Sequence, residues 1–108
     1  MNRLKLWWRN FLERRRKRFG IVVTDDLPEI IPPRVLVLMG EADAPWQAAM
    51  LCPCKCGEVI RLSLVEHDKP RWSARVDDDG LPTLTPSVWR VRGCRSHFIL
   101  TNGRVRWV

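Results

Sequence analysis

The placement of four cysteines is the feature that most constrains how this chain can fold. Cys52, Cys54 and Cys56 alternate within five residues, and Cys94 lies 38 residues further on, followed by His97 in a C-x-x-H spacing. Thiolate and imidazole ligands favour zinc over magnesium or calcium. We therefore predict a zinc site that joins two distant parts of a small protein, for which a metal cross-link is a useful stabiliser.

The ligand set itself stays open, because five candidate groups compete for four positions. The predicted set is the four thiols, which leaves His97 free beside the metal, and the alternative is three thiols with His97. Alternate residues of a regular strand lie about 7 Å apart on one face, which is wide for a zinc pair, so the first cluster must turn. Gly57 and Gly93 flank the two clusters and permit tight turns. Disulfide bonds are less favoured because we expect a cytoplasmic protein, where thiols stay reduced. An iron–sulfur centre is less favoured because the cysteine spacing matches none of the usual patterns.

From Phe19 onward the patterns predict a mainly β protein, a small zinc-stabilised antiparallel β domain built from hairpins. Asn102-Gly103 between two strand patterns is the strongest hairpin signal. The five apolar residues at 35–39 predict a strand buried on both faces, residues 40–45 a loop, and the acidic run at 77–79 with Gly80 a turn. The predicted strands cover residues 21–23, 35–39, 58–65, 71–76, 87–92, 97–101 and 104–108.

A basic amphipathic helix is predicted before this domain, so that residues 1–19 form a helix or tail and residues 20–108 the zinc-binding β domain. Apolar residues recur at helical spacing from Leu4 to Leu12, and a run of five Lys/Arg follows. Residues 1–19 hold eight Lys/Arg and one Glu, whereas residues 20–108 are neutral. The helix could contact an anionic membrane surface, a nucleic-acid backbone or an acidic partner protein, or pack on the β domain. The neutral domain argues against sequence-specific nucleic-acid binding.

The chain lacks the features that would place it in or across a membrane. No apolar run reaches the roughly 18 residues that span a bilayer, and no apolar segment follows the basic N-terminus as in a secretory signal. We therefore expect a cytoplasmic protein.

Ser96 and His97 are the predicted catalytic pair, since they lie beside the metal cluster. In a strand two successive side chains point to opposite faces, but a metal-bound turn loosens this restriction. The alternative is that the Ser96 hydroxyl only caps a turn.

Four motifs resemble a bacterial family of small proteins of unknown function, and the resemblance covers about residues 47–108. The motifs lie at residues 52–57 (CPCKCG), 86–90 (PSVWR), 93–98 (GCRSHF) and 103–107 (GRVRW). The resemblance implies an association with operons that encode a ubiquitin-like protein and its E1-like and E2-like enzymes. It also implies a peptidase that processes or removes the modifier, and the matched motifs offer Ser87, Ser96 and His97 for this role.

Two functions from different classes follow from these patterns. The first is a zinc-containing peptidase or isopeptidase that acts on the ubiquitin-like modifier or its conjugates. The second is a zinc-stabilised binding module that docks on the modifier or on the E1-like and E2-like enzymes without chemistry.

Overall fold

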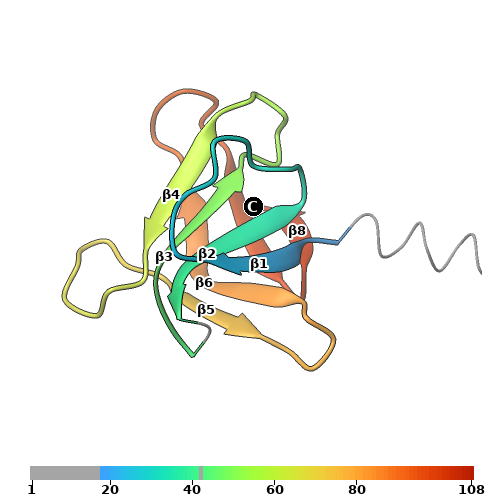
Figure 1. Ribbon diagram of the computed structural model, residues 1–108. Helices are drawn as coiled ribbons and strands as arrows, with labels where there is room; N and C mark the ends of the chain where they lie inside the picture. Colours follow the sequence, from blue (N-terminus) through green and yellow to red (C-terminus); the bar gives the residue numbers. More distant parts are fainter. Residues whose placement is uncertain (1–17, 42) are drawn as a thin grey trace, which may run out of the picture.

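Two four-stranded β-sheets make up the described part of the chain, residues 18–41 and 43–108 of the computed structural model (Figure 1). The predicted N-terminal helix at residues 3–18 lies outside these residues, except for Arg18. The first sheet contains β1 (Gly20–Thr24), β2 (Val35–Glu41), β3 (Ala44–Leu51) and β4 (Val59–Ser63). The second contains β5 (Ser73–Val76), β6 (Pro82–Trp89), β7 (His97–Thr101) and β8 (Arg104–Trp107).

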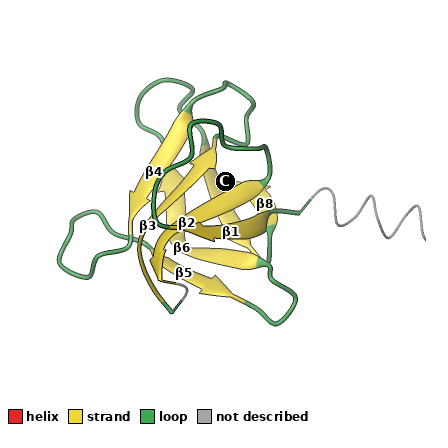
Figure 2. Cartoon of the chain, in the orientation of Figure 1, coloured by secondary structure: helices red, strands yellow, loops and turns green. Residues whose placement is uncertain are grey.

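The strands follow one another in chain order within each sheet, β1 to β4 and β5 to β8. All pairs are antiparallel except β1 with β2, which run parallel, so the prediction of an antiparallel domain needs this one correction. Figure 2 shows strands and loops in the described part of the chain. None of the described residues forms a helix capable of crossing a lipid bilayer.

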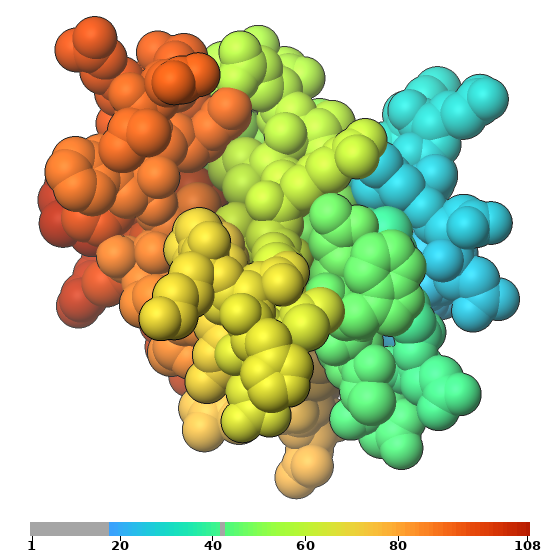
Figure 3. Space-filling view, turned by 90° about the vertical axis from the view of Figure 1, so that its left-hand side faces the viewer, coloured from blue at the N-terminus to red at the C-terminus, as the bar shows by residue number. Residues whose placement is uncertain are grey.

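The main core lies between the two sheets, because alternate residues of each strand point inward. Phe98 of this core is fully buried. Figure 3 shows the second sheet, in orange and red, and the first, in green and blue, as neighbouring parts of one surface, with the yellow β4–β5 connection in front of them. The other fully or almost fully buried core residues are Phe19, Leu36, Leu38, Ala48, Met50, Cys52, Ile60, Leu62, Leu84, Val88 and Leu100.

Strand β2 is buried on both faces, as its continuous apolar run predicts. Leu36 and Leu38 point into the main core, whereas Val37 and Met39 point to the opposite face. There they pack with Ile31, which belongs to the connection between β1 and β2. This connection therefore covers the outer face of the first sheet.

Most strand boundaries differ from those predicted by one or more residues, and β3 is not among the predicted strands. β6 begins at Pro82, five residues earlier than expected, because a register shift between Leu84 and Val88 accommodates Pro86 inside the strand. The predicted loop at residues 40–45 is shorter, since β2 extends to Glu41 and β3 begins at Ala44.

The C-terminal hairpin forms as predicted, and its turn also anchors the first sheet. Asn102 and Gly103 both have positive φ, 49° and 76°, which is the backbone of a type I′ turn. The Phe19 N–H donates to the Gly103 carbonyl at 2.7 Å, and the Gly103 N–H donates to the Pro82 carbonyl at 2.7 Å. The start of β1 is thus held against the β7–β8 turn.

Substituting Gly103 with alanine should destabilise the protein more than the same change at Gly80. Both glycines have positive φ, so each alanine costs about 1–2 kcal/mol of backbone strain. A Cβ at Gly103 would also lie 2.8 Å from the Phe19 carbonyl oxygen, whereas a Cβ at Gly80 meets nothing within 4 Å. Urea unfolding should show at least about 1 kcal/mol more destabilisation for Gly103→Ala than for Gly80→Ala. Equal losses would show that the Phe19–Gly103 contact is not tight.

Candidate functional site

Four cysteine thiols converge where the β3–β4 loop (residues 52–58) meets the β6–β7 loop (residues 90–96), at one end of the two sheets (Figure 1). The Cys52 N–H donates to the Glu58 carbonyl at 2.9 Å, which closes the first loop. Four residues of the two loops have positive φ and bend the backbone sharply. These are Lys55, Gly57, Gly93 and Arg95. The sulfurs that these turns bring together belong to Cys52, Cys54, Cys56 and Cys94.

The spacing of the sulfurs suits a single tetrahedral cation. All four Sγ atoms lie within 4.8 Å of one another, with Cys52 Sγ 3.3 Å from Cys54 Sγ and 3.6 Å from Cys94 Sγ. A zinc ion bound by four thiolates at about 2.3 Å places the sulfurs about 3.8 Å apart. The four cysteines could therefore hold a metal ion, and His97 is not a member of this group.

The thiols differ in how readily each one ionises. Burial raises the pKa of the Cys52 thiol to about 12, whereas the Ser96 hydroxyl, 3.1 Å from the Cys94 sulfur, lowers the pKa of the Cys94 thiol to about 6. Cys94 therefore ionises more readily than Cys52. A coordinated divalent cation deprotonates its thiol ligands, so binding one would release the Cys52 proton.

Arg90 and Glu58 connect the two cysteine loops. The Arg90 guanidinium donates to the Glu58 carboxylate at 2.5 Å, and the Arg90 backbone N–H donates to the Ser96 carbonyl at 2.8 Å. Burial lowers the pKa of Arg90, whereas Glu58 and the Cys52 and Cys94 sulfurs raise it, and the pKa is raised overall. A positive charge therefore lies beside the group of thiols.

His97 makes its side-chain hydrogen bond with Ser87. The Ser87 Oγ lies 2.9 Å from the His97 Nε2, and the two residues come from neighbouring strands β6 and β7. Val88 and Phe98 pair between these strands and are buried, so Ser87 and His97 point to the opposite, outer face of the second sheet. A serine hydroxyl hydrogen-bonded to an imidazole is the arrangement of a nucleophile and its general base.

Neighbouring groups fix both members of this pair. The Trp89 ring stacks on the His97 imidazole with 5.4 Å between ring centroids and 19° between planes. The Ser87 carbonyl accepts a hydrogen bond from the Trp72 indole N–H at 3.3 Å, and the His97 carbonyl accepts one from the Val108 N–H at 3.0 Å. The imidazole and both backbones are thus held in place.

Ser96, the predicted partner of His97, faces the thiols. Its Oγ lies 3.1 Å from the Cys94 Sγ and 3.9 Å from the Cys52 Sγ. The structure therefore pairs His97 with Ser87, which the motif at residues 86–90 also contains. The strand pattern could have indicated this pairing, because a short loop between two adjacent antiparallel strands places Ser87 diagonally across from His97.

Comparison with known families identifies a matching family. The model of a family described as bacterial ubiquitination-like system serine protease (BubE) matches residues 23–108. Searches of curated proteins and of solved structures find no match. The family description confirms the sequence-based expectation of a peptidase in a ubiquitin-like system. The chain belongs to the BubE family, the serine proteases of bacterial ubiquitination-like systems.

Proposed function

We propose that this protein is a zinc-stabilised serine peptidase of a bacterial ubiquitin-like system, with Ser87 as nucleophile and His97 as general base. The observation that carries the proposal is the hydrogen bond between Ser87 Oγ and His97 Nε2 at 2.9 Å. The substrate is a peptide or isopeptide bond at the C-terminus of the ubiquitin-like modifier, in a precursor or a conjugate, encountered in the cytoplasm. The E1-like and E2-like enzymes of the same system supply those conjugates.

The Ser87 and His97 side chains supply the nucleophile and the proton transfers that acyl transfer needs. His97 Nε2 accepts the proton of Ser87 Oγ while this oxygen bonds to the carbonyl carbon of the scissile bond. His97 then donates that proton to the leaving amine as the carbon–nitrogen bond breaks, which leaves an ester on Ser87. His97 next accepts a proton from a water molecule as the water oxygen bonds to the ester carbon. His97 then returns that proton to Ser87 Oγ as the ester bond breaks, which releases the carboxyl product and restores both side chains.

In this proposal zinc holds the site together and takes no part in bond cleavage. Cys52, Cys54, Cys56 and Cys94 would hold the ion through four thiolates, the ligand set of a structural zinc site, which offers no position for a reacting water. Cys94 precedes His97 by three residues, so a metal that fixes the β6–β7 loop also fixes the beginning of β7. The role of Ser96 is to hydrogen-bond to thiolate ligands, which is a common arrangement around metal sites.

Cleavage of a modifier that carries a C-terminal extension tests the catalytic pair. Ser87→Ala and His97→Ala should each lower kcat/KM by about a thousandfold or more, because each removes one member of a unit that acts jointly. Ser96→Ala is the matched control and should keep kcat/KM within about tenfold of the unchanged protein, since its hydroxyl contacts thiols.

Measuring the zinc content of each variant distinguishes a loss of catalysis from a loss of the metal. Zinc should stay at about one ion per chain in Ser87→Ala and His97→Ala. Activity that survives Ser87→Ala but is lost in Ser96→Ala, with zinc retained, would contradict the proposed nucleophile. No cleavage by the zinc-loaded protein would favour the non-catalytic binding module.

X-ray absorption at the zinc edge tests the ligand set independently of activity. Four sulfur ligands at about 2.3 Å are expected. Removing the metal with a chelator, or substituting Cys94→Ser, should lower the Tm by about 10 °C or more, since the site joins the two sheets. A shell of three sulfurs and one nitrogen would make His97 a ligand and remove it as the base.

A further inference from the structure

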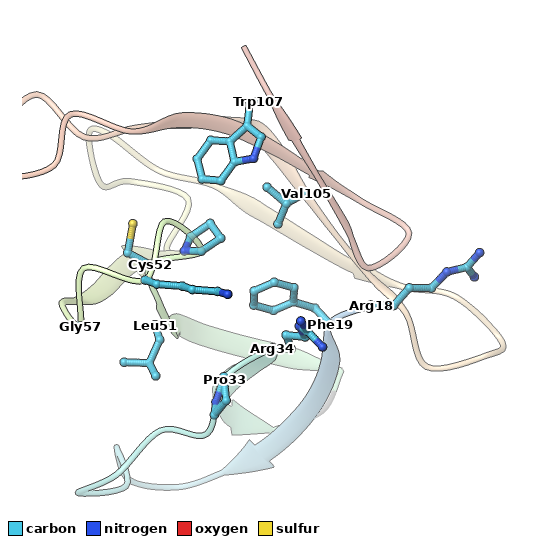
Figure 4. Close-up of a pocket in the computed structure, with 11 residues that line it drawn as sticks. Arg18, Phe19, Pro33, Arg34, Leu51, Cys52, Gly57, Val105 and Trp107 are labelled. Carbon is cyan, nitrogen blue, oxygen red and sulfur yellow. The ribbon is translucent and has the colours of Figure 1, made fainter. Parts of the chain in front are cut away.

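A groove opens between β1 and β8, which are edge strands of the two sheets. It lies on the side of β8 that faces away from β7, and therefore away from Ser87 and His97. It has a volume of about 890 Å³ and runs from Arg18 and Phe19 at one end to Cys52 at the other (Figure 4). In Figure 4, Val105 and Trp107 of β8 lie across from Phe19, with Pro33 and Arg34 on the opposite wall. The groove is therefore bounded by β8 on one side and by the segments around β1 on the other.

The β8 wall offers backbone groups for pairing. β8 is the last strand of the second sheet, and the Val108 N–H donates to the His97 carbonyl. Hydrogen-bonding direction alternates along an antiparallel strand, so the N–H and C=O groups of Val105 and Trp107 point away from β7. These two residues are thus a template for one more strand.

The groove also has a uniform charge. Its ionisable lining residues are the cations Arg18, Arg34 and Lys55 together with the Cys52 thiol, and no carboxylate lines it. Arg18 borders the groove at one end, and it also lines a second hollow with Asp77 and Asp79. Carboxylates of a bound segment would form charge-assisted hydrogen bonds with the cations that line the groove.

From these features we infer that the groove binds an extended acidic segment of a partner protein, which adds to the sheet beside β8. Apolar side chains on one face of that segment pack on Phe19, Val105 and Trp107, and its carboxylates pair with Arg18 and Lys55. The inference concerns a surface separate from the Ser87–His97 pair, so it holds whether or not the protein is a peptidase.

Titration of the full chain with a designed peptide tests this binding. The probe is a peptide of alternating Glu and Val, about eight residues long, which is enough to form one strand. In nitrogen-edited NMR spectra it should shift the Trp107 indole signal, assigned with Trp107→Phe, and the Val105 amide, while the Trp89 indole stays in place. Shifts at Trp7 and Trp8 without shifts at Trp107 would mean that the N-terminal basic segment binds the peptide, and would overturn the inference.

A pair of charge-matched variants separates groove binding from general attraction to a basic protein. Arg18→Gln with Lys55→Gln should weaken binding about tenfold in fluorescence anisotropy, because both charges line the groove. Arg61→Gln with Arg75→Gln removes the same charge from exposed residues outside the groove and should leave the affinity within about twofold. Equal weakening in both variants would overturn the inference.

A modified peptide tests strand addition. Methylating alternate backbone nitrogens removes the donors that pair with β8 and keeps every charge, so binding should weaken about tenfold. An unchanged affinity would contradict pairing with β8.

Discussion

The meeting of four thiols between two loops is the constraint on which the rest of the structure depends. The loops belong to different sheets, so this group joins the sheets at one place, and the hydrogen bond between Phe19 and Gly103 joins them at a second place. The core between the sheets is small, and Cys52 is itself one of its buried residues. A cross-link that also contributes to the core stabilises a protein of this size efficiently.

The same loops determine where the catalytic candidates lie. The β6–β7 loop carries Cys94 and ends at His97, and antiparallel pairing then brings Ser87 of β6 within hydrogen-bond distance. Four thiolates around a divalent cation carry two negative charges in excess, and Arg90 lies where it can offset one of them. Its ion pair with Glu58 holds the two loops together from outside the metal shell. The group of four thiols and the Ser87–His97 pair are therefore neighbours, and the proposed function gives them separate tasks.

Local patterns predicted most of the strands and the convergence of the cysteines. Asn102-Gly103 fixed the C-terminal hairpin, and the apolar run at residues 35–39 indicated burial on both faces, because these signals arise from a few adjacent residues. The parallel pairing of β1 with β2 depends on a connection that carries no such signal. The partner of His97 depends on strand register, because Ser96 is its neighbour in the sequence whereas Ser87 is its hydrogen-bond neighbour in space. The predicted basic helix stays a prediction.

Mapping the serine that reacts with a fluorophosphonate tests the central claim most directly. Such probes form a stable bond with a serine that a neighbouring base has activated. The zinc-loaded protein should carry the label on Ser87, and His97→Ala should abolish labelling. A label on Ser96, or a label on Ser87 that persists in His97→Ala, would contradict the proposed catalytic pair.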